Sequence, residues 1–467
     1  MKKLALFAAL PALLCSCASG TFEAQKKFEE NAGIFQNPGQ GWLRFGSSLK
    51  GSRNSVNFGA GYERYTWAAL NPEEGVYDWK RIDRALENFS REGLPFYFRI
   101  MCVNTSGYPP FYQTPKWVFD KGAKYTVHEM QKEPGKSKSH PDGKVKIAVP
   151  EFGDPVFMDA HEKFVKALAA RYDGDPRLGG LDLGSYGNWG EWHCTSLGLK
   201  KPDVRPHSQE IRRRYADMYL KNFKKTPIIF MTDDHETLEY ALGKGEKPRV
   251  GIRRDGVGSP SHFKRWIGRP PYENITGMGE IWKHMPAIFE FYASVDSMRG
   301  KGWDIPYSLG WVLENHACLV NEGPLSPSQI AAGSGEEKLL REIDLRAGAR
   351  LVPLSADVSY ADGNLKIRIE GENKGASKIY LPYEFVYVLR GESGDAVAEK
   401  VSARDPRKIL PGKFELSDTF EIPLERGREY SLSLRVRHSP GVLGDFRFAA
   451  KNLNPDGSLD LGKISVK

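Results

Sequence analysis

The sequence predicts an α/β fold, a (β/α)8 TIM barrel followed by a C-terminal antiparallel β-sandwich. Between about residues 40 and 320, eight short apolar runs alternate with amphipathic helical stretches, which is typical of parallel β/α units closing into a barrel. After residue 350 the pattern changes to polar–apolar alternation of period two, broken by Gly, Asn and Pro, as in a sandwich. An open doubly wound sheet is the alternative, but no glycine-rich nucleotide loop follows the first run.

The expected barrel strands are short runs rich in branched and aromatic side chains. In chain order they are residues 42–45, 56–61, 96–103, 181–185, 228–232, 250–253, 287–291 and 307–312. The clearest helical patterns lie between them, at residues 79–91, 159–171, 208–223 and 236–242. Two connections are long, 104–150 after the third strand and 186–207 after the fourth. Loops that follow barrel strands form the active face, so we expect the functional site there.

The composition divides the chain behind its N-terminal segment into three parts. We expect the barrel over residues 36–325, a helical linker over 326–349 and the sandwich over 350–467. Within the linker, residues 335–346 have a helical pattern. A sandwich of this kind can bind a ligand or brace the barrel, and we favour bracing.

The first residues have the pattern of an export signal. Lys2 and Lys3 precede an apolar run that is too short to span a membrane. The run ends in Leu-Cys-Ser-Cys, which resembles a bacterial lipoprotein signal cleaved before Cys17 and lipidated on its sulfur. We therefore expect a signal peptide over 1–16, a polar tether over 17–35, and a protein anchored by lipid to the bacterial cell envelope. An ordinary secretory signal is the alternative.

Cysteine content and charge restrict the partners. Three cysteines remain after the signal, so a full disulfide framework is excluded; Cys102 and Cys194 could pair, but three thiols with Cys318 are favoured. The formal net charge is +8, which is compatible with an anionic partner. No basic run is dense enough to indicate nucleic-acid binding.

The segment GSYGNWGEWH, residues 184–193, combines three glycines with two tryptophans and a glutamate. Glycine lets the backbone turn sharply and lets other atoms come close. Tryptophan offers a flat apolar face with one hydrogen-bond donor. Together with Glu191, these residues predict a shaped pocket that holds a carboxylate.

Several motifs resemble clan-A glycoside hydrolases. The segment YTWAALNPEEGVYDWKRIDRAL resembles the region after their second strand, and YFRI resembles their third strand. The segment FVKALAARYDGDPRLGGLDLGSYGNWGEWH resembles the helix and fourth strand that lead to their acid/base glutamate. The chain resembles more closely a poorly characterised group of exported bacterial proteins, in which NPGQGW opens the barrel, GxxGxWGEWH closes the fourth strand and a β-sandwich follows. This resemblance covers most of residues 37–467.

The resemblance implies a retaining glycosidase that cleaves O-glycosidic bonds of an oligo- or polysaccharide. Glu191 would be the acid/base after strand four, and Glu290 the nucleophile on strand seven. Such hydrolysis needs two carboxylates on separate elements facing one cleft. Glu290 is also a single charge inside the apolar run PAIFEFYAS, where it must be hydrogen-bonded or used. A structural carboxylate at Glu191 and a buried salt bridge at Glu290 are the alternatives.

Other acidic residues near strand ends could contact sugar hydroxyls or replace Glu290. They are Asp233, Asp234, Asp255 and Glu314. One departure concerns Gly190, since clan-A enzymes commonly have asparagine immediately before the acid/base. Asn188 lies two residues earlier, and whether it can contact a sugar 2-hydroxyl stays open.

The remaining substrate-binding candidates lie near predicted strand ends or in loops. Aromatic side chains among them would stack against sugar rings, although packing is the alternative for each one. The candidates are Tyr62, Arg64, Trp67, Trp117, Asn188, Trp189, Trp192, His193, Asp233, Tyr292, Glu314 and His316. Arg253 and Arg254 could contact anionic substrate groups or pair with Asp255, and Arg99 is expected to be a buried partner of a carboxylate.

No cofactor or metal is expected. His193, His235 and His316 come from three strand ends, but no ligand spacing of a metal site is present. The expected partners are a carbohydrate and, through the lipid, a membrane. A non-catalytic glycan-binding surface lipoprotein on the same barrel is the second hypothesis. A polysaccharide lyase is compatible with the basic charge, but the barrel motifs argue against it.

Overall fold

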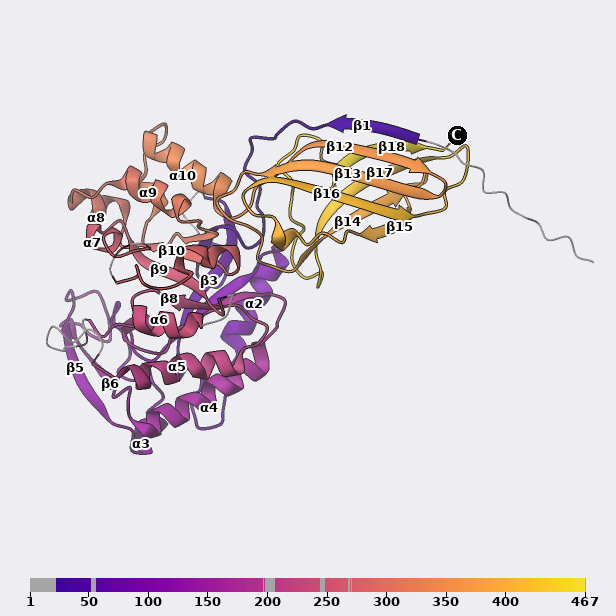
Figure 1. Cartoon of the computed structure of the whole chain (residues 1–467). Helices are drawn as coiled ribbons and strands as arrows, with labels where there is room; N and C mark the ends of the chain where they lie inside the picture. The colour runs from indigo at the N-terminus through magenta and orange to yellow at the C-terminus, as the bar shows by residue number, and fades with distance from the viewer. Residues whose placement is uncertain are drawn as a thin grey trace, which may run out of the picture.

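The predicted barrel and sandwich are both present and joined end to end (Figure 1). The computed structural model describes residues 22–51, 56–195, 197, 206–243, 248–267, 269 and 271–466. The expected signal peptide and Cys17 lie outside these residues. Among the residues described, no helix has the length and apolar character needed to cross a membrane.

Eight parallel strands of the described chain close into the barrel, in the order β10-β11-β2-β3-β4-β7-β8-β9. Seven of the eight expected strands are confirmed, with ends shifted by a few residues. The bounds are β2 Gly41–Phe45, β3 Phe58–Thr66, β4 Phe96–Met101, β7 Leu178–Leu183, β8 Ile228–Met231, β9 Gly251–Val257, β10 Ala287–Phe291 and β11 Leu319–Asn321.

The prediction of a strand at residues 307–312 is wrong. These residues lie in helix α9 (Ile305–Glu314), which begins after Asp304 and has a proline in its first turn. The Asp304 carboxylate accepts a hydrogen bond from the Tyr307 amide at 2.9 Å, as a helix N-cap does. A short apolar run fits a strand or a buried helix equally well by periodicity, and here the cap decides. The eighth strand is β11, seven residues further on.

The helices around the barrel include all four that the sequence predicts. Helix α10, expected in a linker, instead packs on the barrel: Leu340 and Ile343 join its outer core, and Asp344 accepts a hydrogen bond from the Asn57 amide at 2.8 Å. The bounds are α1 Trp67–Leu70, α2 Lys80–Arg91, α4 Pro155–Tyr172, α5 Gln209–Asn222, α6 His235–Leu242, α7 Pro260–Phe263, α8 Val295–Gly300 and α10 Gly335–Arg346, with 3-10 turns η1 Asn188–Gly190, η2 Met278–Lys283 and η3 Pro327–Gln329.

The barrel interior is layered because side chains two residues apart along a strand point to the same face. The layer near the amino ends of the strands is apolar and includes Leu43, Ala60, Ile229, Ile288 and Leu319. The next inward positions toward the carboxyl ends are charged or polar: Arg64, Arg99, Asp182, Arg253, Asp255, Glu290 and Asn321. The strand pattern therefore places a polar cluster directly under the active face.

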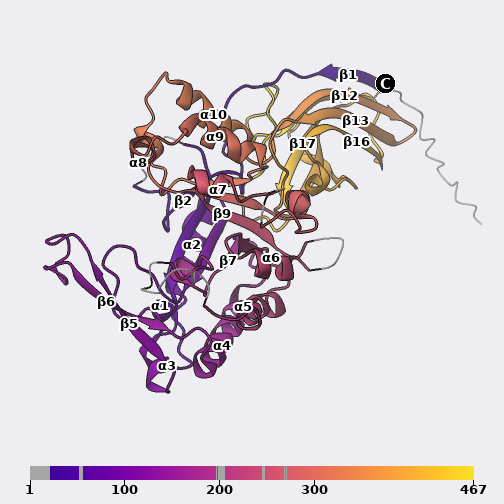
Figure 2. The same cartoon turned by 60° about the vertical axis from the view of Figure 1, so that its left-hand side comes forward.

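The long connection after β4 contains short elements of its own. They are α3 (Lys116–Asp120) and a hairpin of β5 (Tyr125–Gln131) and β6 (Lys144–Pro150). Figure 2 shows this hairpin extending away from the barrel. The connection after β7 contains η1 and the segment with Glu191.

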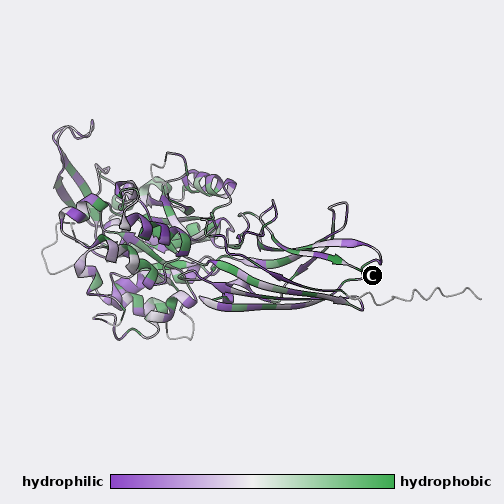
Figure 3. Ribbon diagram, turned by 90° about the horizontal axis from the view of Figure 1, so that it is seen from above, coloured by the Kyte–Doolittle hydropathy of each residue, from purple (hydrophilic) through white to green (hydrophobic). Residues whose placement is uncertain are grey.

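The sandwich consists of two four-stranded sheets, in the orders β1-β12-β13-β16 and β15-β14-β17-β18. Apolar and polar residues alternate along its long strands (Figure 3), and the apolar residues form a core separate from that of the barrel. The bounds are β12 Leu351–Ala361, β13 Asn364–Asn373, β14 Tyr383–Arg390, β15 Ala396–Val401, β16 Gly412–Glu421, β17 Glu429–His438 and β18 Leu459–Ser465, with η4 at Pro406–Lys408.

Strand β1 (Phe22–Lys27) corrects the expectation of a polar tether over residues 17–35. It pairs antiparallel with β12, from Phe22 opposite Tyr360 to Lys27 opposite Ser355. An edge strand can bind through its backbone alone, so its side chains need little apolar character. The mostly polar and exposed sequence FEAQKK therefore resembles a linker although it completes a sheet.

The sandwich contacts the amino end of the barrel. Tyr380 packs against the apolar layer inside the barrel, and its hydroxyl donates to the Trp282 carbonyl. The Lys378 ammonium donates to the Lys283 carbonyl at 2.8 Å. Trp282 and Lys283 precede β10, so the sandwich lies at the end of the barrel opposite the active face.

The three cysteines of the described chain are buried, and none of them forms a disulfide with another. This agrees with the favoured expectation of three thiols. The Cys102 sulfur lies 3.9 Å from Nδ1 of His161, not against Cys194. Burial raises the pKa of the Cys102 thiol well above its ordinary value, so the thiol stays protonated.

Candidate active site

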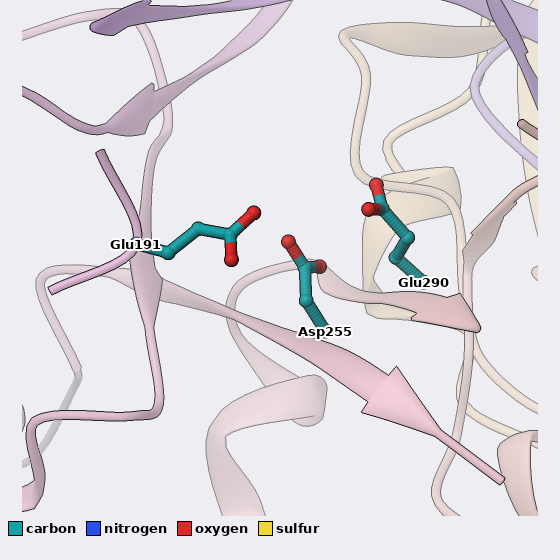
Figure 4. Close-up of side chains that lie close together, drawn as sticks. All are labelled: Glu191, Asp255 and Glu290. Atoms are coloured by element: carbon teal, nitrogen blue, oxygen red, sulfur yellow. The ribbon is translucent and has the colours of Figure 1, made fainter. Parts of the chain in front are cut away.

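Three carboxylates meet at the carboxyl end of the barrel. One oxygen each of Glu191, Asp255 and Glu290 lies within 4.8 Å of the other two. Figure 4 shows the carboxyl groups of Glu191 and Glu290 pointing toward each other, with that of Asp255 between them. All three side chains are nearly buried but keep some contact with solvent, since 8–12% of each is exposed. A small group arriving from outside can therefore reach them.

A sharply turned loop positions Glu191. Three non-glycine residues around it have left-handed backbone conformations: Ser185 (φ 73°), Trp189 (φ 57°) and Trp192 (φ 62°). Such conformations cost energy in residues with a side chain and persist only where the surroundings hold them. Here the Trp189 amide donates to the Val103 carbonyl at 3.0 Å, and the Trp192 indole donates to the Leu183 carbonyl at 2.7 Å.

Two glycines of this loop are required because a backbone carbonyl of β4 approaches them closely. A Cβ on Gly184 would lie 2.3 Å from the Ile100 carbonyl oxygen, and one on Gly190 would lie 2.9 Å from the same atom. Gly190 also has a φ of 69°. The loop thus lies directly on the end of β4, and no larger residue fits where clan-A enzymes commonly have asparagine.

Glu290 on β10 is held by several hydrogen bonds. Nη2 of Arg64 lies 2.9 and 2.7 Å from its two oxygens, and Arg253 donates to one of them. The Asn321 amide donates to the same oxygen at 2.8 Å. The buried salt bridge that the sequence left open as an alternative is therefore present. The same bonds fix the orientation of the carboxylate toward Glu191.

Arginines also link the other acidic groups. Arg99 lies 3.1 Å from both Asp182 and Glu191 and 3.3 Å from Asp255. Arg253 donates to Asp255 at 2.8 Å. Arg64 bridges the candidate catalytic pair, since its Nη1 lies 3.2 Å from Glu191 while its Nη2 contacts Glu290. The result is one connected network in which every carboxylate has a guanidinium partner.

The pKa values of Glu290 and Asp255 are shifted in opposite directions within this network. Burial raises the pKa of Glu290 above its ordinary value, and the charges of Asp255 and Glu191 add to this against Arg64 and Arg253. Burial also acts to raise the pKa of Asp255, but Arg253, Arg99 and Arg64 outweigh it and hold the pKa well below its ordinary value. Asp255 therefore stays ionised at all pH values near neutral, while Glu290 binds a proton more readily.

Three converging carboxylates could act as ligands of a metal ion, but the surroundings of these three do not favour metal binding. Arg64 contacts Glu191, Asp255 and Glu290 within 3.4 Å, so it already supplies the positive charge that a cation would bring. The three histidines considered from sequence do not converge here either. His316 lies at the opposite end of the barrel, and His235 begins α6.

Three of the predicted substrate-binding residues belong to this cluster. Arg64 is described above, and Nε2 of His193 lies 3.5 Å from Glu191. The Tyr62 hydroxyl donates to Asp182 at 2.7 Å and accepts from Arg64 at 3.2 Å. Tyr62 is completely buried, so it supports the charged groups from below and does not face solvent.

Several predicted aromatic contacts are instead core or distant packing. Trp67 is completely buried beside Phe157 and His161. Trp192 is completely buried against Phe230, with ring centroids 4.6 Å apart. Packing, the alternative for each tryptophan, holds for these two because a flat apolar ring is most stable away from water. Trp117 packs edge-on against Trp67 and lines a pocket that does not include the three carboxylates.

Other predicted residues of the loop and strand ends have different roles. Asn188 is buried and its side-chain amide forms hydrogen bonds with Thr105, so it supports the loop, and its contact to a sugar 2-hydroxyl stays a prediction. Trp189 packs edge-on against His193 at 5.8 Å, near Glu191. Asp233 lies 4.0 Å from Arg254, outside the network, and Tyr292 is half exposed beside Trp303 just beyond β10.

The predictions for Glu314 and His316 are wrong because the eighth strand was misplaced. Glu314 ends helix α9 and is exposed. His316 precedes β11, so it lies at the amino end of the barrel, where it stacks on Trp282 at 3.7 Å and contacts the Ala376 carbonyl at 2.8 Å. Neither residue can reach the carboxylates.

Sequence reasoning missed Asp182 and Asn321 entirely. Asp182 is completely buried in β7 and contacts both Arg99 and Tyr62. The signal was available, since Tyr-Glu-Arg, Phe-Arg-Ile, Leu-Asp-Leu and Phe-Glu-Phe each place a charge inside a buried strand. Charged residues on neighbouring barrel strands at matching depth must pair, because isolated buried charges are too costly.

Part of the chain matches a known enzyme family. Residues 55–195 match the family model of glycoside hydrolase 42, described as beta-galactosidase. The matched segment includes β3, β4, β7 and the loop with Glu191, and thus Arg64, Arg99 and Asp182. No curated protein matches the chain.

Solved structures with similarity to the chain include three carbohydrate-active enzymes. Endo-glycoceramidase II from Rhodococcus sp. is 11% identical with a TM-score of 0.37, covering 84% of this chain and 99% of its own. Xylanase B from Clostridium stercorarium is 14% identical with a TM-score of 0.31, over 56% and 77%. The GH5_18 protein from Streptomyces cattleya is 11% identical with a TM-score of 0.33, over 60% and 70%. At these scores the likenesses carry no conclusion, and a glycosidase is the enzyme class that the family match supports.

Proposed function

We propose that the protein is a retaining glycoside hydrolase, with Glu191 as acid/base and Glu290 as nucleophile. The observation that carries the proposal is the approach of the two carboxyl groups from separate elements, with one oxygen of each within 4.8 Å of the other. Retaining enzymes place their carboxyl groups about 5–5.5 Å apart, whereas inverting enzymes leave about 6.5–9.5 Å for a water molecule. The family match across residues 55–195 supports the role of Glu191.

The two carboxyls divide the reaction into two displacements. Glu290 attacks the anomeric carbon while Glu191 gives its proton to the departing glycosidic oxygen, which leaves as the free alcohol. Water then attacks the glycosyl–Glu290 ester, Glu191 takes the proton, and the sugar leaves with its original configuration. Arg253 and Asn321 hold Glu290 in line for the attack.

The charge balance supports a neutral sugar at the point of cleavage. With Glu191 protonated, as the first displacement requires, three carboxylates, Asp182, Asp255 and Glu290, face three guanidinium groups, Arg64, Arg99 and Arg253, so no excess positive charge remains. Arg253, considered from sequence for an anionic group, is occupied by Asp255 and Glu290. An anionic substrate would need an unpaired positive charge at this site. We therefore propose that the basic residues behind the net positive charge of the chain have their role outside the catalytic site.

The stereochemical outcome tests the mechanism. Proton NMR during hydrolysis of aryl β-galactoside, β-glucoside, β-mannoside and β-xyloside should show the β-anomer of the product first, followed by slow mutarotation. A first product of inverted configuration would exclude Glu290 as nucleophile. If no glycoside in this panel or among oligosaccharides is cleaved but a glycan is bound, the non-catalytic binding protein becomes the better account.

The membrane anchor is a separate proposal, motivated by the Leu-Cys-Ser-Cys segment. We expect the chain expressed in a Gram-negative host to incorporate labelled palmitate and to fractionate with membranes. Cys17→Ala should lose the label, while Cys15→Ala should keep it. Release of unlabelled wild-type protein into the periplasm would favour the ordinary secretory signal.

A further inference from the structure

A pocket lies at the rim of the barrel, away from the three carboxylates. Its volume is about 370 Å³, and its walls come from the turn before α2, from α3 and from the first turns of α4. Helices α2 and α4 begin after chain segments that leave the carboxyl ends of β3 and β4. The pocket therefore opens near the same end of the barrel as Glu191 and Glu290.

Two fixed aromatic rings line the pocket. The Trp117 indole donates to the Asn71 carbonyl at 3.1 Å, and its ring meets Trp67 edge-on at 6.2 Å. Tyr77 stacks on Trp79 with centroids 5.1 Å apart and planes 10° apart. Because both rings have partners on their inner sides, their orientation is set before any ligand arrives. A flat ligand face can then stack without ordering a side chain.

The charged groups around these rings balance. Glu74 and Lys121 form an ion pair at 2.5 Å, and Asp159 and Lys163 line the wall formed by α4. Asp159 also pairs with Arg214 at 2.5 Å, and Arg214 in turn lies 3.3 Å from Glu162, so three carboxylates and three cationic groups provide hydrogen-bond acceptors and donors but no net charge. This composition suits a neutral ligand with several hydroxyl groups, and it disfavours an ion of either sign. The volume lies at the lower end of small-molecule sites, which span about 300–1,000 Å³.

We propose that this pocket binds a neutral pyranose unit of a glycan, with the ring stacked on Trp117. The site is distinct from the catalytic centre and does not depend on hydrolysis. Trp67, which contacts Trp117, follows Arg64 by three residues at the end of β3. A glycan held in the pocket would therefore lie on the same end of the barrel as the carboxylates.

Affinity gel electrophoresis tests the proposal with the full chain carrying Glu191→Gln, so that no polysaccharide is consumed. The probes are soluble β-galactan, arabinoxylan, glucomannan and dextran, with polygalacturonate as an anionic comparison. We expect at least one neutral polysaccharide to slow migration, and Trp117→Ala to weaken that binding at least about tenfold. Ala160→Gln should weaken it similarly, because Ala160 lines the pocket on α4 and glutamine would fill the space.

Tyr307→Ala is the matched control, since Tyr307 is a half-exposed aromatic residue on α9. It should bind as well as the parent. Ala160→Gln keeps the test valid if Trp117→Ala unfolds, because it removes no buried contact. Absence of retardation by every neutral polysaccharide, retardation unchanged in both pocket variants, or stronger retardation by polygalacturonate would each overturn the proposal. Loss of hydrolysis alone would not overturn the proposed glycan-binding pocket, so this proposal and the proposed hydrolase activity can fail independently.

Discussion

Glu290→Gln should abolish hydrolysis of all glycosides, because glutamine cannot form the covalent glycosyl ester. Glu191→Ala should lower kcat/KM for glycosides with poor leaving groups by about 10²–10⁴-fold, the usual contribution of a general acid. For a dinitrophenyl glycoside, whose leaving group needs no proton, Glu191→Ala should form the ester rapidly and then stall. Added azide should restore turnover and yield a glycosyl azide of retained configuration. Stopped-flow release of dinitrophenol and product analysis measure both steps.

The sequence itself supplies the controls for this pair. Glu314→Gln should keep wild-type activity, because Glu314 is exposed at the end of α9, although the sequence placed it at a strand end. Asp255→Asn distinguishes the nucleophile, since Asp255 lies between the two glutamates. If Glu290→Gln retained turnover while Asp255→Asn lost the covalent ester, Asp255 would be the nucleophile and the assignment to Glu290 would be wrong.

Arg99→Met should destabilise the protein by about 3–5 kcal/mol, the usual cost of removing one partner from a buried ion pair. The Arg99 side chain is completely buried and contacts Asp182, Glu191 and Asp255. Methionine fills similar space but leaves Asp182, which is also completely buried, with Arg253 at 3.6 Å as its nearest remaining cation. Urea denaturation followed by tryptophan fluorescence measures the change in the free energy of unfolding.

The matched control is Arg91→Met. Arg91 pairs with Glu87 at 3.5 Å on the surface of α2, where both side chains are more than half exposed. Exposed pairs of this kind contribute about 0–1 kcal/mol because water and salt screen the charges, so this variant should be close to wild type. Equal stability of the two variants would show that the charged network does not hold the upper barrel together.

The fold was largely predictable because barrel strands are buried on both faces and give clear apolar runs. The failure at residues 307–312 shows the limit, since an apolar run without polar interruption has no visible period. Asp304 and Pro306 carried the correct signal as a helix start. Strand β1 was missed for the opposite reason: an edge strand that contributes mainly backbone hydrogen bonds has no apolar period to detect.

The candidate site was predictable in its two glutamates but not in its connections. Glu191 and Glu290 follow from motif and strand position, whereas the pairing of Arg99 with Asp182 depends on strand register across β4 and β7. One wrong strand also moved His316 from one end of the barrel to the other. Trp192 and Trp67 looked like ligand contacts, but Trp192 packs against Phe230 of β8 and Trp67 against Phe164 of α4, contacts that the sequence alone does not reveal.

If Cys17 carries the proposed lipid, the position of β1 determines the orientation of the protein relative to the membrane. Phe22 pairs with Tyr360 at the end of the sandwich remote from the barrel (Figure 1). Four residues separate it from Cys17, and the five residue-to-residue steps between them span at most about 18 Å when extended. A lipid on Cys17 would therefore hold that end of the sandwich close to the bilayer. The sandwich would then lie between the membrane and the barrel. The carboxylates lie at the end of the barrel opposite the sandwich, so they would face away from the bilayer, toward glycans outside it.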